Sequence, residues 1–107
     1  MSDTEDAIWA RLKQIPSGRV CSYGDLANSI GRPGYARAVG RLLSRNPEPI
    51  IVPCHRVVRS DGRLGGYMGD HKGAERKKEL LEAEGVEVVE GWLPRFMDIR
   101  FQDFPPL

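Results

Sequence analysis

The sequence predicts an α+β fold that is mainly helical, and three observations support this prediction. Apolar side chains recur at helical spacing in several segments, whereas the β-favouring stretches are few and short. Two of the helical segments are short and flank a turn that contains glycine, which is the arrangement of a helix-turn-helix. The dipeptide Asp61-Gly62 lies between β-favouring residues and predicts a small hairpin or a bent loop.

The first element is predicted to be an amphipathic helix. Ser2 and Thr4 are candidate caps, because hydroxyl side chains accept hydrogen bonds from the free N–H groups of a helix start. The break at residues 16–18 ends this helix, and a short β-like piece follows over residues 19–21. Its apolar face is formed by residues at helical spacing, which are Ile8, Leu12 and Ile15.

The helix-turn-helix is predicted over about residues 22–45. Ser22 begins its first helix, and Asp25, three residues later, completes a variant of the capping box. A turn over residues 31–34 leads to an arginine-rich second helix over about residues 35–44, which Asn46-Pro47 ends. The inward-facing residues of the two helices are predicted to be Leu26, Ile30, Val39, Leu42 and Leu43.

Residues 49–53 are apolar and bounded by prolines. We therefore expect a buried, extended and rigid stretch that delivers Cys54 at its end. The hairpin or bent loop around Asp61-Gly62 follows this stretch. A helix-turn-helix followed by a short hairpin predicts a winged-helix-like domain.

The last predicted helix runs from about Gly73 to Glu84 and stops at Gly85, which is a suitable C-cap. A short β-like piece follows over residues 86–89, and the apolar tail is expected to pack back on the domain. The side chains expected to be buried in the helix are Leu80, Leu81 and Ala83. Those expected to pack from the tail are Trp92, Phe96, Ile99, Phe101 and Phe104.

The composition limits the classes of protein to which the chain can belong. With 107 residues, of which 40% are hydrophobic and 29% charged, it fits one globular domain over residues 1–107 rather than a disordered or fibrous chain. No apolar run approaches the roughly 20 residues that cross a bilayer, and the acidic N-terminus is unlike a signal peptide. We therefore expect a cytoplasmic protein with no membrane association.

The two cysteines and two histidines indicate neither a disulfide nor a metal site. A cytoplasmic chain usually keeps its thiols reduced, so Cys21 and Cys54 are expected to be unoxidised. No CxxC or HxxxH pairing of metal ligands occurs, and no structural zinc is predicted.

Basic residues are concentrated in the middle of the chain. Although the net charge is +1, residues 32–63 hold seven arginines against Glu48 and Asp61, a local net charge of +5. Such a stretch suits a phosphate backbone, and a solvated basic face explains the same count equally well.

Cys54 is the candidate reactive residue. A cysteine is nucleophilic as its thiolate, and His55 is adjacent in sequence to take the proton, directly or through a bridging water. For the dipeptide by itself, a small core cysteine beside a surface histidine is the more common interpretation.

The sequence resembles the O6-alkylguanine-DNA alkyltransferases, also called methylated-DNA–protein-cysteine methyltransferases. The resemblance runs from about Ile8 to Gly85, with its motifs in the order of the family. They are Gly18-Arg19-Val20, Ser22-Tyr23, Ala36-Arg37-Ala38-Val39-Gly40, Asn46-Pro47, Pro53-Cys54-His55-Arg56-Val57-Val58, Gly66-Tyr67, Leu80-Leu81 and Glu84-Gly85.

The resemblance implies a base-flipping reaction in which a thiolate takes the alkyl group from a damaged guanine, with no cofactor consumed. By position, Cys54 is the acceptor, His55 is the water-linked base, and Glu84 is the carboxylate that orients and stabilises the imidazolium. Tyr23 protonates the departing guanine, which is a poor leaving group as an anion. Asn46 holds the cysteine loop, which is expected over about residues 49–58.

The resemblance also assigns a substrate pocket to Val57, Tyr67 and Met68. The backbone carbonyls of Cys54 and Val57 are expected to meet the guanine amino group. Met68 replaces a small hydroxyl residue of the family, so a side-chain hydrogen bond to O6 is expected to be absent, while the backbone N–H can remain. The stretch between Tyr67 and Glu84 is slightly longer than is usual in the family.

The implied partner is double-stranded DNA containing O6-alkylguanine, bound through its minor groove by a monomer. Residues 35–44 form the recognition helix, and Arg37 enters the base stack where the flipped nucleotide has left. The other family positions that contact DNA correspond to Thr4, Tyr23, Gly24, Arg32 and Ser60.

Three other functions remain possible at this point. An alkyltransferase-like protein flips alkylated guanine and recruits other repair factors without transfer; such proteins are often short, and the Pro33-Gly34-Tyr35-Ala36-Arg37 run is similar to theirs. They generally replace the acceptor cysteine, which is present here as Cys54. A helix-turn-helix regulator leaves the Cys-His-Glu set unexplained, and a thiol hydrolase lacks an oxyanion signature. The absence of the family's usual N-terminal domain from the sequence leaves the transfer reaction possible.

Overall fold

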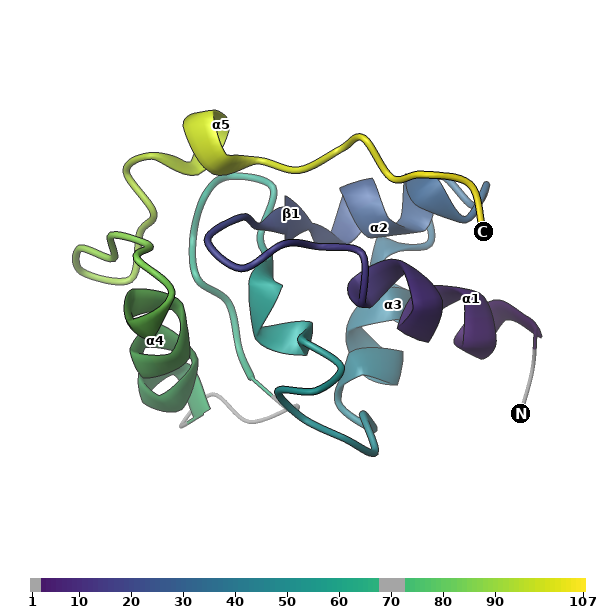
Figure 1. Ribbon diagram of the computed structural model, residues 1–107, viewed down its shortest axis with the longest axis horizontal. Coiled ribbons are helices and arrows are strands. Elements are labelled where there is room, and N and C mark those ends of the chain that lie inside the picture. Colours follow the sequence, from purple (N-terminus) through teal and green to yellow (C-terminus); the bar gives the residue numbers. More distant parts are fainter. Residues whose placement is uncertain (1–2, 68–72) are drawn as a thin grey trace.

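The computed structural model describes residues 3–67 and 73–107, and its elements follow the predicted order (Figure 1). The predicted α+β, mainly helical fold is confirmed. The two short strands are β1 (Cys21–Ser22) and β2 (Val57–Val58). The helices of the described residues are α1 (Asp3–Leu12), α2 (Tyr23–Ser29), α3 (Ala36–Leu43), α4 (Ala74–Ala83), α5 (Phe96–Ile99) and the 3-10 helix η1 (Cys54–Arg56).

The apolar faces of α1, α2 and α3 are buried against one another, as predicted. Removal of these side chains from water is the main source of stability in this half of the molecule. The α1 helix begins at Asp3, so Thr4 lies inside its first turn rather than capping it, and Ser2 lies outside the described residues. The buried apolar residues of the three helices are Ile8, Leu12, Leu26, Ala27, Val39, Leu42 and Leu43.

The helix-turn-helix is confirmed as α2 followed by α3. Ser22 caps α2 with a complete capping box, because its side chain accepts from the Asp25 N–H and the Asp25 carboxylate accepts from the Ser22 N–H. In the turn, Gly31 and Gly34 have φ angles of 72° and 86°, a region that favours glycine. The capping box makes Tyr23 the first residue of α2.

The short sheet is a parallel pair that joins distant parts of the sequence. Cys21 lies opposite Val57 and Ser22 lies opposite Val58. Around Asp61-Gly62, where a small hairpin or a bent loop was predicted, the chain forms the bent loop, in which the Arg59 N–H donates to the Arg63 carbonyl and the Gly62 N–H donates to the Arg59 carbonyl. The reason is that β2 pairs with β1, while the residues after the turn bond to residues 91–93 instead.

The prediction of a buried extended stretch over residues 49–53 is wrong. Ile50 and Ile51 are 49% and 71% exposed, and Ile50 has a φ angle of 78°. A hydrogen bond of 2.9 Å from the Val52 N–H to the Glu48 carbonyl closes a turn. Because this turn points its two isoleucines outwards, only Val52 and Pro53 of the stretch are buried beneath it.

The α4 helix buries a different face from the predicted one. Leu81 is buried as expected and Leu80 is partly buried, but Ala83 is exposed and Lys77 is fully buried. The predicted stop is confirmed: Gly85 has a φ angle of 88°, and the Val86 N–H donates to the Leu81 carbonyl, as in a Schellman motif.

The C-terminal segment packs back on the fold, as predicted, and crosses the molecule beside β1 and α2 (Figure 1). Phe96 is buried, and Phe101 and Phe104 pack against the core of the first three helices. Trp92 is the exception, because it is exposed and lies beneath the Arg63 guanidinium at 4.6 Å.

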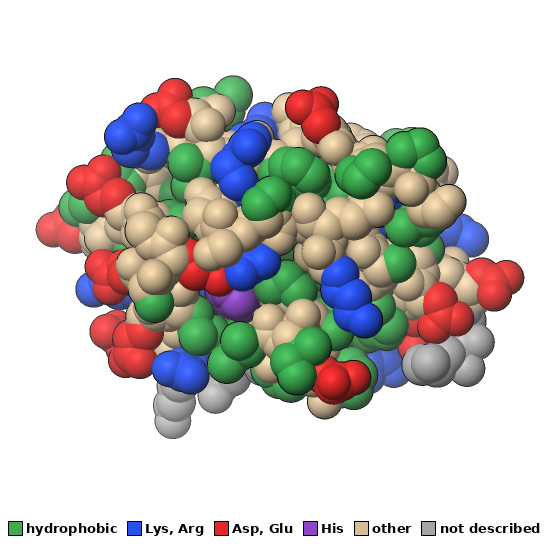
Figure 2. Space-filling view, in the orientation of Figure 1, with side chains coloured by type: hydrophobic (Ala, Val, Ile, Leu, Met, Phe, Trp, Pro, Cys, Tyr) green, Lys and Arg blue, Asp and Glu red, His purple; other side chains and the backbone are tan. Residues whose placement is uncertain are grey.

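Acidic side chains gather at the end of the molecule where α4 and its following loop lie (Figure 2). Negative potential there repels phosphate, so a nucleic acid is expected to bind elsewhere. In the described ranges 3–67 and 73–107, no helix is both long enough and apolar enough to cross a bilayer. The exposed acidic residues of this end are Glu75, Glu79, Glu82, Glu87 and Glu90.

Candidate active site

Cys54 begins η1 and is 5% exposed, directly after the turn that presents the two isoleucines. Burial raises the pKa of its thiol, whereas a hydrogen bond with the Asn46 side chain and the positive charge of Lys77 lower it. Neither Cys54 nor Cys21, both within the described residues, is part of a disulfide. The resting sulfur is therefore a thiol whose ionisation needs a base.

Asn46 connects the end of α3 to the cysteine turn. Its side-chain amide donates to the Val52 carbonyl at 2.7 Å, and its carbonyl oxygen accepts from the Glu48 N–H at 3.0 Å. Asn46 is itself buried. Both ends of the turn are thus fixed by one side chain, which also reaches the Cys54 thiol.

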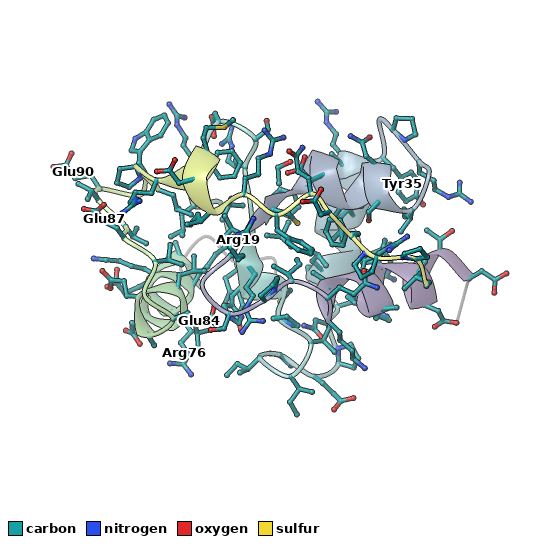
Figure 3. The ribbon with its side chains drawn as sticks, turned by 45° about the horizontal axis from the view of Figure 1, so that its top comes forward. Arg19, Tyr35, Arg76, Glu84, Glu87 and Glu90 are labelled. Carbon is teal, nitrogen blue, oxygen red and sulfur yellow. The ribbon has the colours of Figure 1, made fainter. Side chains whose placement is uncertain are left out.

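His55, 1% exposed, is held by a carboxylate from the far end of α4. Its Nε2 lies 3.1 Å from Oε2 of Glu84, the C-cap residue labelled in Figure 3. Arg56 Nε donates to both oxygens of Glu84, at 3.0 and 3.1 Å, and its Nη2 bonds to Oε2. The Arg56 Nη1 also donates to the Ile15 carbonyl at 2.7 Å.

These contacts determine the charges of the histidine and the carboxylate. Burial tends to raise the pKa of Glu84, but the hydrogen bonds from Arg56 and His55 outweigh it and keep that pKa below its ordinary value. For His55, burial lowers the pKa more than the Glu84 charge raises it. A neutral imidazole beside a charged carboxylate is the state of a general base.

The second imidazole nitrogen is available for a proton. Among the described residues, His55 Nδ1 is buried and has no hydrogen-bond partner. Because Nε2 faces Glu84, Nδ1 is the atom left to receive a proton from the adjacent thiol, directly or through water.

Tyr23 reaches the site through the parallel pairing of β1 with β2. It follows β1 directly, and β2 follows η1, so the pairing brings the phenol to the cysteine. Burial raises the pKa of Tyr23, and the negative charge of an ionised Cys54 raises it further. The phenol is therefore protonated at neutral pH and able to donate.

Lys77 is a site residue that the sequence patterns did not indicate. Its fully buried ammonium donates to the carbonyls of Val57 and Leu64, both at 2.6 Å, and of Gly66 at 3.0 Å. It also lies 5.8 Å from the centre of the Tyr23 ring. Burial lowers the pKa of Lys77 to about 7, and an ionised Cys54 raises it. The one sequence signal was its i, i+4 spacing from buried Leu81.

The predicted pocket residues Val57 and Tyr67 lie together in the core around Cys54. The Val57 carbonyl accepts from Lys77, and a carbonyl oxygen can accept two hydrogen bonds. Met68 lies outside the described residues.

A groove of about 550 Å³ opens beside Tyr23. It brings together four of the predicted DNA-contacting residues, from α2, α3 and the loop after β2. The other two lie apart from it: Thr4 is in the first turn of α1, and the Arg32 guanidinium lies over the Tyr35 ring at 5.5 Å. The residues that line the groove are Tyr23, Gly24, Ala36, Arg37, Gly40, Arg59 and Ser60.

No group of three or more potential metal ligands occurs in the parts of the chain that the structure describes. The chemistry that these residues can supply is acid–base and nucleophilic: a thiol, an imidazole with a charged carboxylate, and a protonated phenol.

Comparison with known proteins identifies relatives of this chain. A methylated-DNA–protein-cysteine methyltransferase of Salmonella typhimurium is 51% identical over 78 residues, covering 73% of this chain and 44% of that protein. The structure of Mycobacterium tuberculosis OGT in complex with DNA matches with a TM-score of 0.72 and 48% identity, covering 78% of this chain and 50% of that one. The chain spans about half the length of the curated methyltransferases that it matches.

A shorter protein matches over a larger share of both chains. The structure of S. pombe Atl1 in complex with damaged DNA containing O6-carboxymethylguanine has a TM-score of 0.81 at 30% identity, covering 94% of this chain and 96% of that one. A family model described as 6-O-methylguanine DNA methyltransferase, DNA binding domain, matches residues 3–86. With most of its length matched by that model, the chain belongs to the 6-O-methylguanine DNA methyltransferase family through its DNA-binding domain.

Proposed function

We propose that the chain repairs O6-alkylguanine in double-stranded DNA by transferring the alkyl group irreversibly to Cys54. The observation that carries this proposal is the pairing of a buried thiol with a histidine whose partner is a charged carboxylate, beside a protonated phenol. The names of relatives about 50% identical, which are methylated-DNA–protein-cysteine methyltransferases, support the same reaction.

The reaction is a direct displacement in which each residue has one task. The thiol proton passes to His55, and the Cys54 sulfur attacks the alkyl carbon. The bond between that carbon and O6 breaks, and its electron pair passes to the guanine, which takes a proton from Tyr23. The proton on His55 then replaces the one lost by Tyr23, so the reaction consumes no cofactor.

Glu84, Asn46 and Lys77 support this reaction without bonding to the alkyl group. The Glu84 charge stabilises the imidazolium that forms on His55, across the 3.1 Å contact. Asn46 fixes the cysteine turn, and the positive charge of Lys77 favours the thiolate. Because the product is a thioether, each molecule acts once.

The groove beside Tyr23 is proposed to bind the DNA. Arg37 is an exposed cation on α3, where it can enter the base stack and offset part of the unstacking cost. Gly24 and Ser60 line the same groove and are placed to meet the sugar–phosphate backbone. A cation in the stack and contacts with the backbone do not require a particular base sequence, which suits a repair protein.

Mass spectrometry after incubation with a duplex containing O6-methylguanine tests the proposal. We expect the peptide bearing Cys54 to gain one methyl group per protein molecule, while the peptide bearing Cys21 is unchanged. Cys21 is an internal control because burial and the neighbouring Asp25 charge raise its thiol pKa strongly. A Cys54→Ser variant is expected to bind the duplex but to gain no methyl group.

A second function, damage binding without transfer, is favoured by the near-complete match to S. pombe Atl1. In that case the chain flips the alkylated base and presents the complex to other repair factors. The same incubation separates the two functions: an unmodified Cys54 peptide, together with tight binding to the alkylated duplex, supports damage binding and overturns transfer.

A further inference from the structure

The C-terminal segment, residues 96–105, lies beyond the residues 3–86 that the family model matches. Backbone hydrogen bonds on both sides of Arg100 join this segment to Val20. The Val20 N–H donates to the Ile99 carbonyl at 3.1 Å, and the Phe101 N–H donates to the Val20 carbonyl at 2.6 Å. Val20 immediately precedes β1, so the segment runs beside the strand that leads to Tyr23.

Side chains from α1 and from the loop that follows it hold this segment in place. Arg19, labelled in Figure 3, donates to the Ile99 carbonyl at 2.9 Å and to the Arg100 carbonyl at 2.7 Å. Arg11 and Gln14 both donate to the Pro105 carbonyl. These hydrogen bonds hold the segment near both of its ends, and they thereby fix the position of Arg100.

Arg100 forms a two-point ion pair with Asp25. Its Nε donates to Oδ2 and its Nη2 to Oδ1, both at 2.8 Å, and Gln102 adds a bond of 3.0 Å to Oδ1. The Asp25 side chain is 4% exposed. A carboxylate so deeply buried needs a charged partner, and planar, two-point pairing is the strongest form of such a contact.

Asp25 is also the residue that completes the capping box of α2. Its Oδ2 accepts from the Ser22 N–H at 3.0 Å while it accepts from Arg100, so one carboxylate joins the C-terminal segment to the start of the helix. Tyr23 and Gly24 are the next two residues after the cap, and both line the groove. The ion pair of Arg100 with Asp25 therefore helps to determine where the Tyr23 phenol points.

We propose that Arg100 is a positioning residue for the transfer reaction, acting through Asp25 to hold Tyr23 at the departing guanine. This inference rests on the proposed function, in which Tyr23 gives its proton to guanine. Without Arg100 the buried Asp25 charge lacks its partner, so the carboxylate turns towards water and leaves the cap. The C-terminal segment therefore supports the transfer reaction and does not serve only to bury the core.

A double-mutant cycle between Arg100→Ala and Tyr23→Phe tests the inference under single-turnover conditions. In the wild-type background we expect Arg100→Ala to slow methyl transfer by about 10- to 100-fold, the scale of a small displacement of a catalytic group. In the Tyr23→Phe background the same change is expected to slow transfer by less than about threefold, because its target is already absent. Arg95→Ala, in an exposed surface pair with Asp98, is the matched control and is expected to have no effect.

Alkylation of Cys54 by iodoacetamide separates a positioning role from a general loss of structure. Iodide leaves without a proton, so its departure does not depend on Tyr23, and Arg100→Ala is expected to react at the wild-type rate. Equal losses of transfer in both backgrounds, or a matching fall in iodoacetamide alkylation, overturn the inference. If Arg100→Ala does not fold, Arg100→Lys, which keeps the charge but not the two-point geometry, takes its place in the cycle.

Failure of the proposed function gives a different result, because the wild-type protein then transfers no methyl group. In that case the same cycle is measured by the dissociation constant for the duplex containing O6-methylguanine. Coupling between Arg100 and Tyr23 in binding supports the positioning of Tyr23 by Arg100 at the alkylated base, and additive effects overturn it.

Discussion

The imidazole of His55 and the carboxylate of Glu84 face each other at 3.1 Å, although 29 residues separate them in the sequence. The contact depends on two elements meeting: η1 presents the histidine, and the C-terminal end of α4 presents the glutamate. Arg56 also holds the glutamate, because its Nε donates to both carboxylate oxygens. The pair therefore forms only when α4 is packed in place, which links the chemistry of the site to the fold.

Glu84→Gln is expected to reduce methyl transfer by about 10- to 100-fold, because it removes the charge that stabilises the imidazolium. It also lowers the pKa of His55 further, since the Glu84 charge raises that pKa against the effect of burial. The acid limb of the rate profile, which reflects protonation of His55, therefore moves to lower pH. Single-turnover rates measured from pH 5 to 8 check both effects.

The matched control is Glu82→Gln, which changes an exposed glutamate of the same helix. Its transfer rate and its pH profile are expected to equal those of the wild type. A Glu84→Gln profile that coincides with the wild-type profile contradicts the role given to the pair.

Lys77→Met is expected to change how stability depends on pH. Burial lowers the pKa of Lys77 to about 7 in the fold, well below the value near 10.5 of an exposed lysine. Between these two values the unfolded chain binds one more proton, so the free energy of unfolding rises with pH, by at most about 1.4 kcal/mol per pH unit. Below pH 7 both states hold the proton, and this contribution is constant.

Urea unfolding at several pH values between 6 and 10 measures this slope. The difference in unfolding free energy between wild type and Lys77→Met is expected to increase with pH in favour of the wild type. Lys78→Met, at the next position of α4, is expected to keep the wild-type slope. Parallel curves for wild type and Lys77→Met contradict the lowered pKa.

The contrast between Ser22 and Lys77 shows which features the sequence could predict. The capping box of Ser22 and Asp25, the ends of α3 and the glycine stop of α4 follow local rules, and all three were predicted correctly. The burial of Lys77 depends on three carbonyl acceptors that lie 11 to 20 residues away. No spacing rule indicates such a cage, because a lysine is normally exposed.

The stretch over residues 49–53 was wrongly predicted for a related reason. Apolar composition indicated a buried strand, but the Asn46 side chain supplies the hydrogen bonds that a neighbouring strand would otherwise supply, and a turn forms instead. The parallel pairing of β1 with β2 was missed because it joins residues 36 positions apart. The set of Cys54, His55, Glu84 and Tyr23 was predicted through the family resemblance, since periodicity alone could not bring it together.

Gly73→Ala is expected to disturb Tyr67, a residue of the predicted substrate pocket. A Cβ at this position would lie 2.7 Å from the Tyr67 carbonyl oxygen, which is too close, and 3.2 Å from the Tyr67 Cβ, which is a tight contact. The φ angle of −71° suits alanine, so the conflict is purely steric. Because relief requires α4 or Tyr67 to move, the variant is expected to lose about 1–3 kcal/mol of stability.

Thermal unfolding measures this loss, and Glu75→Ala, in the exposed first turn of the same helix, is the control. That variant is expected to stay within about 0.5 kcal/mol of wild type. A Gly73→Ala protein as stable as wild type would show that the start of α4 can move away from Tyr67 without cost.

Tyr23→Phe tests the acid that the displacement requires. The phenol is held protonated, because burial and the charge of an ionised Cys54 both raise its pKa. Without this proton the guanine must leave as an anion, so transfer from O6-methylguanine is expected to fall by about 100-fold or more. Alkylation of Cys54 by iodoacetamide is expected to be unchanged, because iodide needs no proton.

The dissociation constant for alkylated DNA is measured alongside, since Tyr23 also lines the groove. If only binding is weakened and the rate at saturating DNA is unchanged, Tyr23 is a DNA contact and does not supply the proton to the departing guanine.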